Sequence, residues 1–487
     1  MIDWLGPGIT CSKMPTSDAR ACLLFSTILI QIAACSGATD SAPSGVTGSA
    51  ASVAGSAGSF AAGGGPSSAA GGGLSSAAAG GGLSNAAGGA GGGAAAASGG
   101  AGMLTAAAGQ GGTTSAAGAS SSAGSLSAAA GSAAAGASAV ATGTPEVTPQ
   151  GYGQSTTGGG KTKTLTVSSF AALQAAIDSY SGTGGLVLEY SGKFDFASIK
   201  DPCVQHTLPA QAVEIKSKSD ITISGAAGSS ANFGFHIAAA ASNVIIRNMT
   251  IGLLPGGSDS DIISIEGMSG GVPNNIWLDH NELFSSLADC PGAGDTAFDG
   301  MIDIKKGGDL ITVSYNYLHD HHKVSLNGYT DGDDAVRHIT FHHNLFENIG
   351  SRVPLQRHGY AHVVNNLFSK VLASGINVRM GGYALVEANY FENVKNPVTA
   401  RDSSAVGFWD LRNNNLRSAA DVAPGNAFGI TWDDGNSGTV NATAWATTAA
   451  FPAALGYTLA AQPAQCVHDG LRAAVGANKG LATLKCQ

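Results

Sequence analysis

Three short stretches decide the fold of this chain: His342-His343-Asn344-Leu345-Phe346, Val364-Asn365-Asn366-Leu367-Phe368 and Glu387-Ala388-Asn389-Tyr390-Phe391. In each stretch an asparagine is followed two residues later by a phenylalanine. The asparagines are 22 and 23 residues apart. A repeat of this length is typical of a solenoid, in which each coil of the chain stacks on the one before it.

The same pattern recurs along the whole C-terminal part of the chain. It appears at Asn248, Asn281, Asn316 and Asn414 as well, and the successive steps are 33, 35, 28, 22, 23 and 25 residues. The segments between are short, rich in Val, Ile, Tyr and Phe, and therefore typical of strands. Asparagine tolerates a left-handed backbone, and its amide can hydrogen-bond to the asparagine of the next coil.

We therefore predict an all-β fold, a parallel β-helix with an asparagine ladder, whose neighbouring coils bury one continuous core. The alternatives are a β-sandwich or a propeller, but the period is too short for a four-stranded blade of about 40 residues. The longest steps lie on either side of Asn281, so we expect long functional loops there.

The composition divides the chain into two regions. Of 487 residues 71 are Gly, only 12% are charged, and no charged residue occurs between Ser41 and Pro145. Residues 36–150 are therefore expected to be a disordered Ala/Gly/Ser-rich linker, and residues 151–487 the folded domain. That domain has 22 Lys plus Arg and 29 Asp plus Glu, a net charge of −7. No nucleic acid partner is expected, and a polyanion could bind only at a locally basic groove.

The N-terminus has the features of an export signal. The apolar run Ala21–Ile32 is too short to span a bilayer, which needs about 20 residues, and it follows Lys13 and Arg20. It ends at Cys35 in a sequence that resembles a lipoprotein signal, so we predict lipidation of this thiol. Residues 1–35 would then be a lipoprotein-type signal peptide, with Met14 as an alternative start. The alternative is an ordinary secretory signal.

These features predict an exported protein. It would be a lipoprotein of the cell surface or outer membrane, held there only by its lipid, or otherwise secreted. Of the seven cysteines, the four that follow the linker are Cys203, Cys290, Cys466 and Cys486. An even number in an exported chain predicts disulfides. Three pairings are possible, and we favour Cys203–Cys290 and Cys466–Cys486.

Acidic residues gather where the loops are long. Asp259 and Asp261 lead into one predicted strand, and Asp299 and Asp303 begin another, with Gly300 between them to allow a close approach. Four carboxylates from adjacent coils form a set of oxygen ligands that suits Ca²⁺. The alternative is ordinary aspartate in surface turns.

Basic residues follow on the same stack of coils: Lys305, Lys323, Arg352 and Arg357. If each coil advances the solenoid by about 4.8 Å, they form one stripe beside the acidic cluster. Each one alone would be a solvated surface cation. Several histidines also lie here, and we expect them at coil corners or on the surface rather than on a metal: His319, His321, His322, His342 and His343.

Five features occur in order within about residues 155–487: Asn275-Ile276-Trp277-Leu278-Asp279-His280-Asn281, the run from Asp299 to Lys305, Val313-Ser314-Tyr315-Asn316-Tyr317, Lys323, and Arg352-x-Pro-x-x-Arg357. Together they resemble the extracellular pectate lyases of the pectate lyase C type. The resemblance implies a right-handed parallel β-helix, expected to be a monomer. It also implies calcium-dependent cleavage of polygalacturonate by β-elimination, which gives 4,5-unsaturated oligogalacturonates.

The resemblance also implies roles for single residues. The Ca²⁺ ligands would be Asp259, Asp261, Asp299 and Asp303. Arg352 would be the base, and Lys305, Lys323 and Arg357 would bind substrate carboxylates. Asp279 and His280 match a motif that is mainly structural in the family. Two departures are an Asp at 299, where close relatives can have Glu, and a shorter loop before Asp261.

The chemistry explains this choice of residue types. The C5 proton of galacturonate is weakly acidic, and its removal places more negative charge on the adjacent carboxylate, which cations stabilise. A guanidinium keeps its proton to about pH 12 or above, so an arginine base predicts an alkaline optimum. The alternatives are a pectin lyase acting on methylated pectin, a polygalacturonase, or a non-catalytic β-helix that binds surface glycans. The four Asp argue against a pectin lyase.

Overall fold

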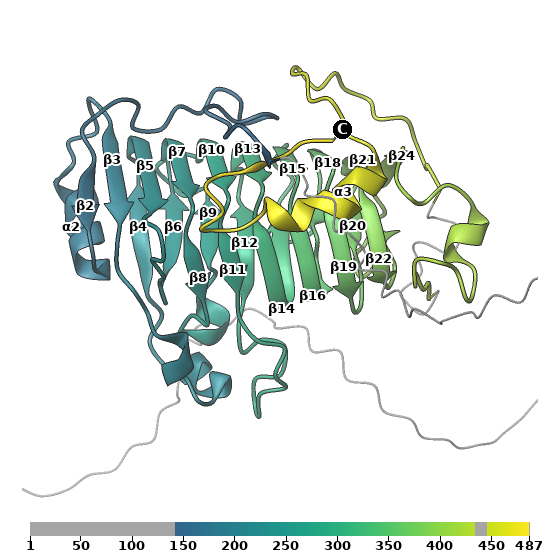
Figure 1. Ribbon diagram of the computed structural model, residues 1–487, viewed down its shortest axis with the longest axis horizontal. Helices are drawn as coiled ribbons and strands as arrows, with labels where there is room; N and C mark the ends of the chain where they lie inside the picture. The colour runs from purple at the N-terminus through teal and green to yellow at the C-terminus, as the bar shows by residue number, and fades with distance from the viewer. Residues whose placement is uncertain (1–141, 434–445, 487) are drawn as a thin grey trace, which may run out of the picture. The chain divides into compact units, whose positions relative to one another are not determined.

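The chain forms a parallel β-solenoid (Figure 1). The structure, a computed structural model, describes residues 142–433 and 446–486. The predicted signal peptide, Cys35 and the linker up to residue 141 lie outside these ranges. One wall of the solenoid is a ten-stranded sheet, in the order β2 (Leu165–Val167), β3 (Leu186–Tyr190), β5 (Ser219–Gly225), β7 (Ser242–Arg247), β10 (Asn274–Asp279), β13 (Asp309–Ser314), β15 (His338–His342), β18 (Tyr360–Val364), β21 (Tyr383–Glu387) and β24 (Phe408–Arg412).

The facing walls belong to a thirteen-stranded sheet. Its main path is β4 (Ala212–Lys216), β6 (Gly234–Ala238), β9 (Ile263–Glu266), β12 (Gly300–Lys305), β14 (Tyr317–Asn327), β16 (Leu345–Ser351), β19 (Leu367–Val371) and β22 (Tyr390–Val394). Beside this path lie β8 (Thr250–Gly252), β11 (Glu282–Phe284), β17 (Leu355–Arg357), β20 (Ile376–Arg379) and β23 (Val398–Thr399). All pairs within these two sheets are parallel, so the predicted parallel β-helix is confirmed.

The core is built from columns of apolar residues that repeat once per coil. One column in the ten-stranded sheet is paired in register and fully buried: Ile223, Ile246, Leu278, Val313, Phe341, Val363 and Val386. A second column consists of the phenylalanines of the repeat, with Phe346, Phe368 and Phe391 stacked at centroid distances of 5.0 and 4.7 Å. The repeat therefore marks the inward-facing position of each coil. Stacking these positions buries a core that one coil alone could not form.

The asparagine ladder is present, with one change of register. Six asparagines are fully buried: Asn281, Asn316, Asn344, Asn366, Asn389 and Asn414. Each of the first five donates from its side-chain amide to the Oδ1 of the next, over 2.9–3.1 Å. The left-handed residue of each corner is the one before the ladder asparagine, for example His343 (φ 53°) and Asn365 (φ 54°).

Asn248 does not occupy the ladder position that the repeat predicts for it. It is itself left-handed (φ 56°) and aligns with His280, so Met249 occupies the ladder position. The main-chain N–H of Met249 accordingly donates to Asn281 Oδ1. An asparagine suits both places, because its side chain tolerates a left-handed backbone and can also span coils.

Short helical elements close the solenoid. The helix α2 (Phe170–Ser179) packs Leu173 and Ile177 against the first coil and is capped by the Ser169 hydroxyl. Elsewhere lie η2 (Phe196–Ser198), η3 (Pro202–Thr207), η4 (Gly257–Asp259), η5 (Ala419–Val422), η7 (Leu471–Ala473) and α3 (Ala464–Gly470). No helix in the described ranges is long and apolar enough to cross a membrane.

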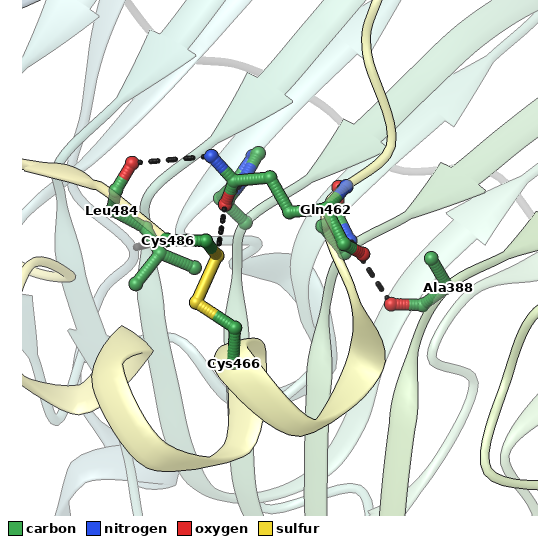
Figure 2. Close-up of a disulfide and its surroundings, with 7 residues drawn as sticks. Ala388, Gln462, Cys466, Leu484 and Cys486 are labelled. Carbon is green, nitrogen blue, oxygen red and sulfur yellow. Dashed lines mark hydrogen bonds between the residues drawn. A yellow bond between two sulfur atoms is a disulfide. The ribbon is translucent and has the colours of Figure 1, made fainter.

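Both favoured disulfides are present. Cys203–Cys290 joins η3 to the loop after β11, with a sulfur–sulfur distance of 2.03 Å. Cys466–Cys486 joins α3 to the C-terminal segment, where the carbonyl of Leu484 accepts from Gln462 Nε2 (Figure 2). Next to this disulfide, β25 (Thr483–Leu484) pairs antiparallel with β1 (Thr142–Gly143). The first described residues are thus held by the last part of the chain.

Candidate active site

The predicted acidic cluster comes from neighbouring coils of the thirteen-stranded sheet. Asp261 lies just before β9, and Asp303 lies on β12, where it pairs with Ser264 of β9. The main-chain N–H of Gly300 donates to Asp261 Oδ1 over 3.0 Å. A Cβ atom at position 300 would lie 2.2 Å from Asp303 Oδ1, so any larger residue would displace this carboxylate. Glycine therefore allows Asp261 and Asp303 to approach the same point.

The Asp261 carboxylate raises the proton affinity of two neighbouring carboxylates. Burial, and then the Asp261 carboxylate, raise the pKa of Asp303 well above its usual range. The same two causes raise the pKa of Asp299. Two ammonium groups offset the repulsion, since Lys305 Nζ lies 2.6 Å from Asp261 Oδ2 and Lys323 Nζ lies 3.4 Å from Asp299 Oδ1. Three carboxylates against two lysines leave a position that attracts a further cation.

An open groove passes this cluster. Its lining includes Asp261, Asp299 and Lys305, and on earlier coils Glu214, His236, Ser264 and Glu266. Asp259 ends the short helix η4 beside the groove, but its side chain lies outside what the structure describes. The groove thus has glutamates on β4 and β9 and a histidine on β6, and Lys305 of β12 also lines it.

The predicted basic residues continue across the following coils. Gly300, Lys323 and Ser351 are register partners, and Arg352 follows Ser351 directly. The backbone of Arg352 is left-handed (φ 62°), and its carbonyl accepts from the N–H of Ser325 over 2.8 Å. Within the described ranges its guanidinium makes no ion pair or hydrogen bond. Left-handed residues occur at many turns of this fold, and this one forms the turn between β16 and β17.

Arg357 lies at the end of β17 and is held from both sides. Its Nε donates to Asp331 Oδ1 over 2.8 Å, and its Nη1 donates to the carbonyl of Gly328 over 2.9 Å. Its register partner on the next coil is Arg379, which the sequence analysis did not select. Burial and the charges of Arg357 and Arg352 lower the pKa of Arg379 to about 10. No motif in the sequence marks Arg379, because its coil lacks an Arg-x-Pro sequence like the one that begins at Arg352.

A second residue missed at the sequence level is His321. It is buried, its Nδ1 contacts the Ser285 hydroxyl, and its Nε2 lies 2.6 Å from the carbonyl oxygen of Asp299. Burial lowers its pKa to about 3, so the neutral ring donates to that carbonyl and fixes the backbone of Asp299. The expectation of corner or surface histidines is wrong for His321 and His342, which are buried on strands.

His343 does lie at a coil corner, but it is buried and stacked on Tyr315, 4.7 Å between centroids. Asp279 ends β10 of the ten-stranded sheet and His280 follows it at the coil corner, apart from the carboxylate cluster. Asp279 is fully buried, pairs with Arg247 Nη2 over 2.6 Å and accepts from the Ser314 hydroxyl. These contacts are those of a structural ion pair.

The residues present fit calcium by their chemistry. Among the side chains that the structure describes, no group of three or more His, Cys, Asp or Glu is gathered as a finished metal site. The side chains nearest to such a site offer only hard carboxylate oxygens, and burial together with the neighbouring Asp261 carboxylate raises the pKa of both Asp299 and Asp303. Oxygen ligands and excess negative charge favour Ca²⁺ over a softer metal.

Solved structures with this fold carry related sequences. Pectate lyase II of Xanthomonas campestris is 55% identical, with a TM-score of 0.64, and the match covers 68% of this chain and 99% of that one. Pectate lyase C from Erwinia chrysanthemi, solved at pH 9.5 with 30 mM Ca²⁺, is 38% identical with a TM-score of 0.64, covering 70% and 99%. A mutant of pectate lyase C, solved in complex with pentagalacturonic acid, is 39% identical with a TM-score of 0.63, covering 69% and 98%.

Curated relatives agree with this. Pectate lyase 3 of Pectobacterium carotovorum subsp. carotovorum is 45% identical over 311 residues, 62% of this chain and 80% of that protein. The family profile described as pectate lyase matches residues 69–480. The chain therefore belongs to the pectate lyase family of polysaccharide lyases.

Proposed function

We propose that this protein cleaves polygalacturonate by calcium-dependent β-elimination, with Arg352 as the base that removes the C5 proton. The observation that carries the proposal is the position of Arg352. Its guanidinium belongs to the coil after Lys323 and is near enough to the buried Asp303 for its charge to oppose the rise in the pKa of that carboxyl. It has no ion-pair partner in the described ranges, so it is available to a substrate.

The other cations divide the remaining tasks. Lys323 and Arg357 donate to the carboxylate of the galacturonate unit that loses its proton, where negative charge grows in the transition state. Lys305, one strand earlier, is paired with Asp261 and holds a neighbouring carboxylate of the polymer when that pair opens. Donors fixed by the strands before substrate arrives need little reorganisation during the reaction.

Asp259, Asp261, Asp299 and Asp303 are the residues that would hold calcium. When bound, Ca²⁺ supplies Lewis-acid stabilisation of the same developing charge by contact with the substrate carboxylate. His321 supports this set because it fixes the backbone of Asp299. The proposal includes an alkaline optimum, since the base must be a neutral guanidine. The pKa of about 10 for nearby Arg379 is consistent with this environment.

The deciding assay follows the ultraviolet absorbance of unsaturated products on polygalacturonate, with and without EDTA. We expect product formation that EDTA removes and added calcium restores. No absorbance under either condition would exclude lyase action, and a signal unaffected by EDTA would exclude the calcium requirement. Activity on methylated pectin alone would indicate a pectin lyase.

A variant tests the base directly. Arg352→Ala is expected to lose turnover by at least about a thousandfold while it still binds polygalacturonate, because only the proton-removing group is gone. Arg412→Ala is a control for loss of a surface arginine, since Arg412 pairs with Asp410 away from the groove. Full activity of Arg352→Ala, or a peak of activity near pH 5, would contradict the arginine base.

We also propose that the chain before β1, residues 1–141, exports and tethers the enzyme. The two disulfides support an oxidising, extracytoplasmic location. Lipidation of Cys35 would hold the protein at a membrane surface, and the Ala/Gly/Ser-rich segment would separate the domain from it. The intact mass of the protein from the membrane fraction tests the lipid, and a mass without an acyl chain would show a secreted form.

A further inference from the structure

The loop after β14 is held in place by several hydrogen bonds, one of them to the residue that follows β12. The Asp333 carboxylate accepts from the main-chain N–H groups of Tyr329 and Lys306, each over 2.8 Å. It also pairs with the fully buried Arg337, whose Nη1 donates to the carbonyl of Ala335 over 2.9 Å. A loop anchored at these points can hold a neighbouring side chain in one geometry.

Asp331, on this loop, joins three separate coils. Its Oδ1 accepts from Arg357 Nε over 2.8 Å, and its Oδ2 accepts from the Ser404 N–H and hydroxyl over 2.9 and 3.0 Å. Its carbonyl oxygen lies 3.1 Å from His358 Nε2. Both carboxylate oxygens are therefore used, and these bonds hold the pKa of Asp331 below its usual range despite partial burial.

Arg357 needs such a partner. It is the register partner of Arg379, and like charges repel: burial and then the charge of Arg357 lower the pKa of Arg379. The carboxylate of Asp331 is one of the two acidic groups that oppose this effect on Arg379. Arg357 donates hydrogen bonds from Nε to Asp331 and from Nη1 to the carbonyl of Gly328. Its Nη2 has no hydrogen-bond partner in the described ranges.

We infer that Asp331 is a positioning residue for Arg357: it holds this guanidinium against the repulsion of Arg379, joins it to the Ser404 loop, and leaves Nη2 free for a substrate carboxylate. This inference rests on the proposed lyase function. Asp331 itself does not touch the substrate and acts only through Arg357.

The test is a double-mutant cycle on polygalacturonate. Asp331→Ala is expected to lower kcat/KM about tenfold or more, because a charge-assisted hydrogen bond is lost. Asp331→Asn keeps an acceptor for Nε and should lie between this variant and the wild type. In an Arg357→Ala background, Asp331→Ala should change kcat/KM by less than about twofold, because the two residues act as a unit.

Asp334→Asn is the matched control. Asp334 is an exposed aspartate on the same loop, and it makes no ion pair within the described ranges. The control should stay within about twofold of the wild type. An equal loss for Asp331→Ala with and without Arg357, or no loss at all, would overturn the inference.

A second readout separates this inference from the proposed function. The NMR signal of the Arg357 Nε–H proton can be assigned by its disappearance in Arg357→Lys. This proton should exchange slowly with solvent in the wild type and rapidly in Asp331→Ala. This comparison does not depend on turnover. A protein without lyase activity would contradict the proposed function alone, whereas unchanged exchange in Asp331→Ala would contradict the positioning role alone.

Discussion

At the scale of single residues, Gly300 has two functions at once. Its N–H binds Asp261, and its missing side chain leaves room for Asp303. Gly300→Ala should therefore keep the fold, with a loss of about 1–3 kcal/mol from overpacking, but weaken calcium binding and reduce activity at least about tenfold. The measurement is the rise in Tm on adding calcium, together with turnover.

The control for this change is Gly332→Ala. A Cβ atom there would have only the Thr330 hydroxyl within 4 Å, at 3.9 Å, so no clash results. If calcium raised the Tm of Gly300→Ala and of the wild type equally, the result would show that Asp261 and Asp303 do not share a cation.

Outside the groove, Glu146 is a carboxyl group whose environment changes its titration. Burial and the nearby Asp279 carboxylate raise its pKa from 4.5 to about 7, and its Oε2 is buried without a hydrogen bond. A carboxyl group whose pKa is higher in the folded state than in the unfolded state destabilises the fold at any pH where the group is ionised. The penalty is absent below pH 4.5, grows between 4.5 and about 7, and is constant above.

Glu146→Gln should remove this penalty. We expect the variant to gain about 1–3 kcal/mol over the wild type at pH 8 and nothing at pH 4. Unfolding in denaturant at several pH values measures the difference, with Glu189→Gln on β3 as a control. A constant difference across this range would contradict the role of Glu146 ionisation.

At the scale of elements, the ladder makes each coil depend on the next. Asn366 Oδ1 accepts from the N–H and the amide of Asn344, and its own amide donates to the carbonyls of Phe341 and Val364. Asn366→Ala would leave several buried polar groups without partners. We expect a loss of about 3–5 kcal/mol, measured by denaturant unfolding.

Asn393→Ala tests whether this loss belongs to the ladder. Asn393 is exposed and left-handed (φ 53°), so its replacement should cost only about 1–2 kcal/mol from backbone strain. Similar losses for both variants would mean that the ladder bonds contribute little beyond backbone conformation.

The elements also show what the sequence could reveal. The repeat predicted a solenoid with an asparagine ladder and a continuous core, and in the structure its phenylalanines, Phe346, Phe368 and Phe391, form one column of that core. It did not separate the left-handed corner from the ladder position at Asn248, since asparagine serves in both. Asp331 was not predicted either, because its partners Arg357 and Ser404 are 26 and 73 residues away and no spacing rule joins them.

At the scale of the whole molecule, the charge of the side chains changes sign along the stack of coils. Glu214, Glu266 and Asp261 line the groove on the early coils, and Lys323, Arg357 and Arg379 lie on later coils. A domain with a net negative charge can therefore still offer a basic segment to a polyanion. The order of the coils explains how residues far apart in the sequence come to follow one another, but it did not reveal Arg379, which no motif marks.

The entry of the chain into the domain gives a final prediction. Residues 152–159 cross the ten-stranded sheet and donate main-chain hydrogen bonds to side chains of β15, β13, β7 and β5: Thr340, Thr312, Asn243 and Thr222. Figure 1 shows this N-terminal segment running across the strands. A protein that begins at Thr142 should match the full chain in Tm and in activity on soluble polygalacturonate.

A protein that begins at Lys161 lacks this strap and the β1–β25 pairing that the Cys466–Cys486 disulfide supports. Five main-chain hydrogen bonds to side chains of the sheet, at about 1 kcal/mol each, predict a fall in Tm of roughly 10 °C. The carboxylate cluster and Arg352 lie on the other sheet, so kcat at low temperature should change little. If the shorter protein kept the Tm of the longer one, the strap would be dispensable and the folded domain would begin after it.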